Sequence, residues 1–90
     1  MTSALIIDRT RAYVVENFLY MRPDFQLGEA DSLLERGIID SMGVMELVAF
    51  IESEFGVTVG DDDVTEENIG SLRAIAGFVS ARVPRDAMVA

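Results

Sequence analysis

The sequence contains no cysteine and no histidine. The absence of cysteine excludes disulfides, thiolate nucleophiles and zinc–thiolate sites. The absence of histidine removes the commonest general base and metal ligand, which excludes most hydrolase and metalloenzyme mechanisms. We therefore expect no catalytic residue and no metal site, and we expect that the chain is not an enzyme.

Lysine is absent as well, so seven arginines carry all the positive charge against sixteen acidic residues, for a net charge of -9. Such a chain is repelled by nucleic-acid phosphates and by anionic membranes, and its natural partners carry basic patches. No apolar run reaches the length of a membrane span, and no signal peptide is evident at the N-terminus. We expect a cytoplasmic protein that neither binds nucleic acid nor inserts into membranes.

Ninety residues, half of them hydrophobic, predict a single folded domain over residues 1–90. Helical spacing dominates, and the expected helices run from Ser3 to about Tyr20, from Ser41 to about Phe55, from about Thr65 to Ile69, and from a Ser71 cap to Pro84. The prediction is an all-α, four-helix bundle, with three main helices, one short helix and a long first loop. Its helical core spans about residues 4–82, and residues 84–90 are expected to form a flexible tail. Because the chain starts at Met1 and ends soon after the last helix, we expect a freestanding, monomeric protein.

The long connection over residues 21–40 has some structure of its own. Its segment Ser32–Glu35 has the form of a capping box, which predicts a short turn. Four apolar residues are expected to hold the connection against the core: Leu33, Leu34, Ile38 and Ile39.

The predicted second helix has two apolar faces. At 100° per residue, one stripe must face the core: Val44, Leu47, Val48, Ile51 and Phe55. A second apolar group points away from the core and consists of Met42, Met45 and Ala49, with Glu46, Glu52 and Ser53 around it. Scattered exposed apolar residues are one interpretation, since they are normal singly. A partner surface is the other, because flexible methionines within an acidic ring suit brief contacts with basic proteins.

Ser41 stands at the start of this helix, where its ordinary role is that of an N-cap. With no histidine or lysine to activate it, Ser41 is a poor nucleophile for catalysis within the chain. Another enzyme can still modify it, and a phosphate ester is well tolerated at a helix N-terminus.

The run Gly37–Leu47, with Asp40 and Ser41 at its centre, resembles the phosphopantetheine attachment motif of carrier proteins. The run Ile51–Val57 also fits this family, as does the spacing of apolar residues from Ile69 to Val79, so the resemblance covers about residues 5–82. The Met42–Gly43 pair is more similar to D-alanyl and other aminoacyl carriers than to fatty-acid carriers.

The resemblance implies that Ser41 holds a 4′-phosphopantetheine arm, which a separate Mg²⁺-dependent phosphopantetheinyl transferase takes from coenzyme A. The thiol of the arm would then hold an acyl or aminoacyl group as a thioester, loaded by a ligase and passed to a downstream synthase or transferase. Asp40 would assist recognition by the phosphopantetheinyl transferase. The residues implied or expected to meet partner enzymes are Met42, Met45, Glu46, Ala49 and Glu52.

Three alternatives compete with this interpretation. The pair Asp31-Ser32 is closer in letters to the commonest form of the family motif, but Gly37 interrupts any helix that starts there. A small acidic adaptor without a prosthetic group would explain the charge and the second apolar face, but gives no reason for an Asp-Ser pair. A calcium loop starting at Asp61 would need glycine at its sixth position and glutamate at its twelfth, which hold Glu66 and Leu72.

Overall fold

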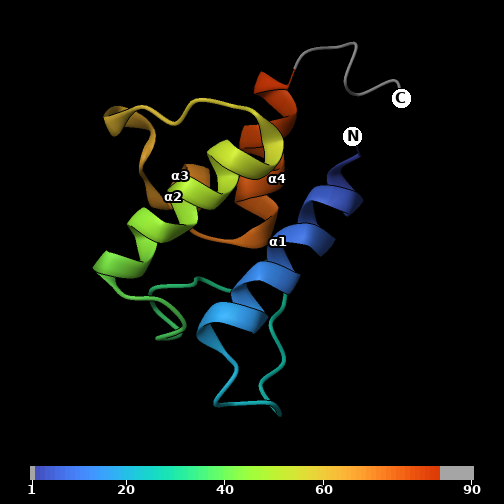
Figure 1. Cartoon of the computed structure of the whole chain (residues 1–90), viewed down its shortest axis with the longest axis vertical. Coiled ribbons are helices and arrows are strands. Elements are labelled where there is room, and N and C mark those ends of the chain that lie inside the picture. Colours follow the sequence, from blue (N-terminus) through green and yellow to red (C-terminus); the bar gives the residue numbers. More distant parts are fainter. Residues whose placement is uncertain (1, 84–90) are drawn as a thin grey trace.

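The computed structural model of the protein describes residues 2–83, and within them it contains helices and no strand. The elements in chain order are α1 (Ser3–Phe18), α2 (Ser41–Phe55), the 3-10 turn η1 (Asp61–Asp63), α3 (Glu66–Ile69) and α4 (Leu72–Arg82) (Figure 1). The predicted class, a small all-α bundle with a long first loop and one short helix, is confirmed. The turn η1 was not predicted.

The start and end of α1 differ from the prediction. Thr2, not Ser3, is the N-cap, since its backbone is extended and its side chain accepts a hydrogen bond from the backbone N–H of Leu5. The helix ends at Phe18 rather than near Tyr20, and the change of direction at Leu19 leaves that side chain almost fully buried. Burial of one more leucine therefore accompanies the earlier helix end.

The other helix ends follow the sequence signals. Gly56 ends α2 with a φ of 69°, a left-handed conformation that favours glycine. Thr65 and Ser71 cap α3 and α4, each accepting a hydrogen bond from the backbone N–H three residues later. The last helix ends at Arg82, and the predicted tail over residues 84–90 lies outside the described residues.

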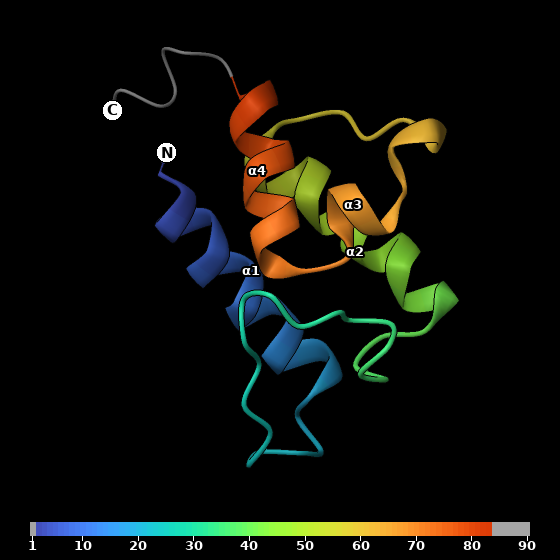
Figure 2. The same ribbon diagram turned by 180° about the vertical axis from the view of Figure 1, so that it is seen from behind.

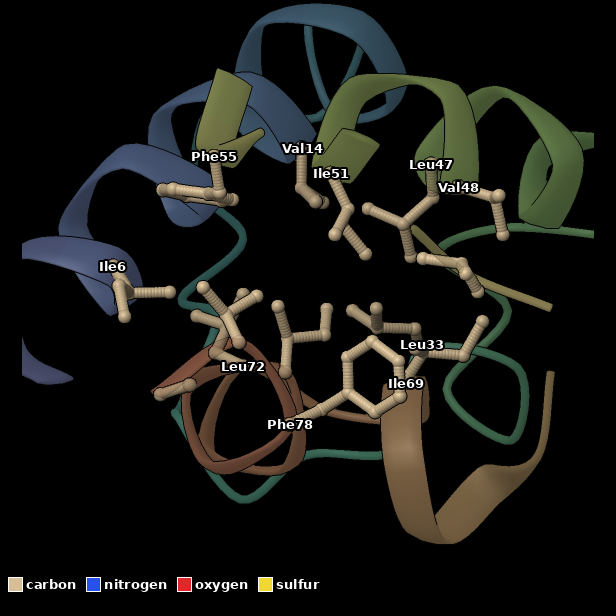
Figure 3. Packing of buried hydrophobic residues seen from close by; sticks show 14 of the residues in the cluster. Ile6, Val14, Leu33, Leu47, Val48, Ile51, Phe55, Ile69, Leu72 and Phe78 are labelled. Atoms are coloured by element: carbon tan, nitrogen blue, oxygen red, sulfur yellow. The ribbon is translucent and has the colours of Figure 1, made fainter. Parts of the chain in front are cut away.

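The core lies between α4 on one side and α1 and α2 on the other. In both views α1 lies beside α4 (Figures 1 and 2), and the Oγ atoms of Ser3 and Ser80 are 3.3 Å apart. Figure 3 shows Leu47 and Ile51 directed from α2 into the core, with Leu72 on the α4 side of it. All three of these side chains are fully buried, and each contributes about 1.5–3 kcal/mol by leaving water.

The long first loop packs on this core, but only part of the predicted contact exists. Leu33, Ile38 and Ile39 are buried, and the backbone N–H of Leu33 donates to the carbonyl of Gly70 at 2.9 Å. Leu34 is 47% exposed, so its predicted core position is wrong. The turn that follows Ser32 directs the Leu33 side chain into the bundle, and the side chain of Leu34 then points outward.

None of the helices described here combines the length and the apolar character that crossing a membrane requires.

Candidate functional site

Asp40 and Ser41 lie where the long loop enters α2. The backbone of Asp40 is extended, and its Oδ1 accepts a hydrogen bond from the backbone N–H of Gly43 at 2.8 Å. Its carbonyl accepts the first helical bond, from the N–H of Val44 at 3.0 Å. Asp40 is therefore the N-cap, and the interpretation of Ser41 as the cap is wrong. Ser41 is the first residue of the helix itself, because the aspartate one position earlier already satisfies the first turn.

This placement frees the Ser41 side chain. It is exposed, and its hydroxyl makes no hydrogen bond to any other residue between 2 and 83. The backbone N–H groups of Ser41 and Met42 likewise have no acceptor in that part of the chain. A phosphate on Ser41 Oγ would therefore lie beside free N–H donors and the positive end of a 15-residue helix.

Ser32, the rival residue, is engaged. Its hydroxyl hydrogen-bonds to the Glu66 carboxylate of α3, and its Oγ accepts from the backbone N–H of Glu35 at 3.3 Å. The predicted short turn at Ser32 is confirmed. Modifying the Ser32 hydroxyl would break this hydrogen bond between the first loop and α3, whereas modifying the Ser41 hydroxyl breaks no hydrogen bond in the described chain.

An apolar pocket of about 310 Å³ opens beside Ser41, between α2, α3 and the first loop; we call it the α2–α3 pocket. Its lining consists of Leu33, Leu34, Ile39, Ser41, Val44, Met45, Val64, Thr65, Glu66, Ile69 and Gly70. Val44, which was predicted to face the core, is only half-buried because it borders this pocket. Such a lining suits the hydrocarbon part of a ligand, with Glu66 as the single ionisable side chain on it.

The second face of α2 is exposed as predicted. Met42 is 79% exposed and Met45 is 62% exposed, and Glu46 and Ala49 lie on the surface with them. Glu52 has a structural contact as well, since its Oε2 accepts from the backbone N–H of Val59 at 2.9 Å. That hydrogen bond holds the segment after α2 in place. Glu52, which was predicted to meet partner enzymes, therefore also stabilises the fold.

Charge is distributed unevenly around this face. Five ion pairs connect arginines to acids in residues 2–83: Arg9–Glu54, Arg11–Asp8, Arg36–Asp31, Arg73–Glu29 and Arg82–Asp63. None of these pairs involves Asp40 or Glu46, so both carboxylates keep their charge available for a basic partner. The acidic residues 61–63 are partly used internally, because Asp63 accepts from the N–H of Gly60 and pairs with Arg82. No group of three or more possible metal ligands occurs in the described chain.

An aromatic contact between α1 and α2 was not predicted from the sequence. The ring of Phe50 stacks on Tyr13 at 4.1 Å between centroids, and the Tyr13 hydroxyl donates to the carbonyl of Glu46 at 3.2 Å. Burial, followed by the nearby Glu46 charge, raises the pKa of Tyr13 above its ordinary value. Phe50 belongs to neither apolar face of α2. Its position around the helix, away from the core stripe, was the signal that could have indicated a separate contact with another helix.

The reason for Gly43 was also missed. Gly43 is buried in the first turn of α2, and a Cβ atom there would lie 3.1 Å from Phe18 Cε1 and 3.2 Å from Ile39 Cβ. Glycine therefore lets the end of α1 and the end of the loop approach the turn that presents Ser41. Close packing against Phe18 and Ile39 thus explains the glycine of the Met42–Gly43 pair.

Comparison with known proteins agrees with this geometry. The family model described as the phosphopantetheine attachment site matches residues 14–79. An acyl carrier protein from Zymomonas mobilis subsp. mobilis is 36% identical over 72 residues, which is 80% of this chain and 87% of the relative. A D-alanyl carrier protein from Abiotrophia defectiva is 33% identical over 52 residues, which is 58% of this chain and 66% of the relative.

The small helical bundle and the match of the attachment-site model to residues 14–79 together define a carrier domain. The chain belongs to the phosphopantetheine-attachment family. It is a carrier protein that works through a covalently attached 4′-phosphopantetheine arm, and it is not itself an enzyme. The thiol that the sequence lacks comes with the arm. These findings favour the carrier over the adaptor without a prosthetic group.

Proposed function

We propose that Ser41 is the residue that carries the phosphopantetheine arm. The observation that supports this most directly is the contrast between two serines. Ser41 has an exposed hydroxyl with no hydrogen bond within residues 2–83, and Ser32 is held by Glu66 and by the backbone of Glu35. The first turn of α2 adds free N–H donors and a favourable dipole for a phosphodiester. Asp40 supports the site by capping that turn and by offering a negative charge to the transferase.

The transfer is chemically balanced with coenzyme A as the donor. Ser41 Oγ forms a bond to the phosphorus nearer the pantetheine, and the bond from that phosphorus to the bridging pyrophosphate oxygen breaks. Adenosine 3′,5′-bisphosphate leaves, and the proton of the serine hydroxyl is released. The chain has no histidine or lysine to remove that proton, and the neighbouring Asp40 carboxylate caps α2, so the phosphopantetheinyl transferase supplies the base.

The α2–α3 pocket supports an apolar acyl group as cargo over a charged aminoacyl group. The pocket is adjacent to Ser41, and each methylene that enters it gains about 0.8 kcal/mol by leaving water. A D-alanyl group would keep an ammonium that is expensive to bury.

The partners we propose are enzymes with basic patches: the phosphopantetheinyl transferase, a loading ligase, and a downstream synthase or transferase. Asp40 and Glu46, which belong to no ion pair in the described part of the chain, and the exposed methionines between them support a contact on the outer face of α2. We further propose that the chain acts as a single monomeric domain in the cytoplasm. Its match to 87% of the Zymomonas acyl carrier protein supports the single domain.

The test is an intact mass measurement after incubation with coenzyme A, Mg²⁺ and a promiscuous phosphopantetheinyl transferase. We expect the wild-type chain and Ser32→Ala each to gain one phosphopantetheinyl group, and Ser41→Ala to gain none. A known carrier protein in the same reaction controls for an active transferase. Modification of Ser41→Ala, or loss of modification in Ser32→Ala while that variant stays folded, would contradict the assignment of Ser41.

A further inference from the structure

Glu66 interrupts the otherwise apolar wall of the α2–α3 pocket. The polar side chains of the lining are those of Ser41, Thr65 and Glu66. Ser41 is the proposed attachment residue, and the Thr65 hydroxyl caps α3 by accepting from the backbone N–H of Asn68. Glu66 is therefore the polar group of the lining that remains to be explained, and it is the one ionisable side chain there.

The first loop and α3 together hold the Glu66 carboxylate in place. From the loop, the Ser32 hydroxyl hydrogen-bonds to Glu66 Oε1. From the end of α3, Gly70 provides the space that the carboxylate occupies, because a Cβ atom at position 70 would overlap Glu66 Cδ and Oε2 as well as its backbone carbonyl. The φ of Gly70 is -76°, which any residue adopts, so the close approach of Glu66 explains this glycine.

The Glu66 carboxylate keeps unused capacity to accept hydrogen bonds. A carboxylate offers about four acceptor positions. Within residues 2–83 its one hydrogen-bond donor is the Ser32 hydroxyl, and Glu66 takes part in none of the five ion pairs. Glu66 is also exposed at the edge of the pocket, so a group inside the pocket can reach it. A donor on the cargo would be stabilised there, and a negative charge on the cargo would be repelled.

We propose that Glu66 is a specificity-determining residue for the cargo, and that the α2–α3 pocket prefers an acyl chain that carries a hydroxyl group. The proposal rests on the proposed function, in which Ser41 holds the arm and the pocket receives the acyl chain. The methylenes of the chain would contact the apolar lining, and the hydroxyl would donate to Glu66, as the Ser32 hydroxyl does from the loop. Burying a hydroxyl costs free energy unless it is hydrogen-bonded, and a charged acceptor makes the stronger bond.

Protection of the thioester from hydroxylamine tests the proposal. A promiscuous transferase loads the apo chain from octanoyl-coenzyme A and from analogues with one hydroxyl near the thioester, at mid-chain or at the far end. Intact mass confirms each loaded chain. We expect at least one hydroxylated cargo to be protected as well as octanoyl in the wild type. Glu66→Ala should shorten the lifetime of that cargo about tenfold and leave that of octanoyl nearly unchanged.

Three further variants separate recognition of the cargo from packing of the pocket. Glu66→Gln keeps an acceptor oxygen and should retain part of the protection. Ser32→Ala removes the hydrogen bond from the loop but leaves the carboxylate, so the hydroxylated cargo should stay protected. Glu67→Ala is the matched control, because Glu67 is exposed on the same short helix and does not line the pocket. Thermal unfolding followed by circular dichroism checks that each variant is folded.

The outcomes distinguish this proposal from the proposed function. If every hydroxylated cargo has the same lifetime in Glu66→Ala as in the wild type, the role of Glu66 is wrong while the pocket stands. If Ser32→Ala loses as much protection as Glu66→Ala, the hydrogen bond between the loop and α3 is what matters, and recognition of the cargo by Glu66 is overturned. Octanoyl cleaved as fast as free octanoyl-pantetheine would instead overturn the proposed acyl cargo, and a chain that cannot be loaded would overturn the assignment of Ser41.

Discussion

The two Asp-Ser pairs of this chain are alike in sequence and different in structure. In the pair Asp31-Ser32, the aspartate accepts from the backbone N–H of Gly28 and pairs with Arg36, and the serine connects the loop to Glu66. In the pair Asp40-Ser41, only the aspartate is used internally, as the cap of α2. The first pair therefore holds the fold together, and the second leaves one hydroxyl available for chemistry.

The residues that follow each pair show the same division. Leu33 is fully buried and donates its N–H to Gly70, whereas Leu34 is exposed and borders the α2–α3 pocket. After the second pair, Met42 is exposed and Gly43 is buried. Adjacent residues in each of these two segments thus differ in role: one packs inside the bundle and the next lies on its surface. Single substitutions can therefore test the packing and the surface separately.

The largest expected difference is between Leu33→Ala and Leu34→Ala. Truncating the buried Leu33 removes core packing and should lower the free energy of unfolding by roughly 2–5 kcal/mol. Truncating Leu34 should change it by less than about 0.5 kcal/mol, as for other exposed positions. Urea unfolding of the two variants measures both values. Equal losses would show that the first loop packs differently from the structure described here.

A smaller effect is expected at the cap of α2. Asp40→Ala removes the acceptor for the N–H of Gly43 and should cost about 1 kcal/mol of stability. Asp40→Asn keeps a good capping side chain and removes only the charge, so it should unfold nearly like the wild type. The rate of phosphopantetheine transfer to the two variants separates the effect of the cap from that of the charge. If the charge of Asp40 contributes to the transfer, both variants react more slowly than the wild type. If only the cap contributes, Asp40→Ala alone is slower. Urea unfolding that places Asp40→Asn with Asp40→Ala would contradict the capping role.

The smallest difference in stability should be between the two serines. Ser32→Ala loses the hydrogen bond to Glu66 and should lower the free energy of unfolding by about 0.5–1.5 kcal/mol. Ser41→Ala loses no hydrogen bond within the described residues and should unfold within about 0.5 kcal/mol of the wild type. Ser32→Ala is thus the variant expected to lose more stability, whereas Ser41→Ala is the variant expected to lose modification by phosphopantetheine. A destabilised Ser41→Ala would mean that its hydroxyl has a structural partner.

Several features of the fold could be predicted from local signals. The extent of α2, its end at Gly56 and the Ser71 cap of α4 depend on residues within one or two helical turns, so spacing and capping chemistry are sufficient. The two apolar faces of α2 follow from the helical period in the same way. The start of α1 was misplaced by one residue because Thr2 and Ser3 are both good caps, and the local sequence does not choose between them.

The features that could not be predicted depend on distant contacts. The partner of Ser32 is 34 positions away, and the Tyr13–Phe50 stack joins two different helices. Leu33 and Leu34 are identical and adjacent in the sequence. Which of them is buried depends only on how the turn that contains them packs against the helices. Gly43 is explained by Phe18, which belongs to another helix.

The sequence by itself determined the class of protein, because the run Gly37–Leu47 around Asp40 and Ser41 resembles the attachment motif of carrier proteins, and the family model matches residues 14–79. The tertiary structure decided which serine hydroxyl is free, where the apolar pocket opens beside it, and which outer residues surround it. The physical reason is that a hydroxyl becomes available only when no neighbour in space satisfies it. The fold brings those neighbours together from every part of the chain.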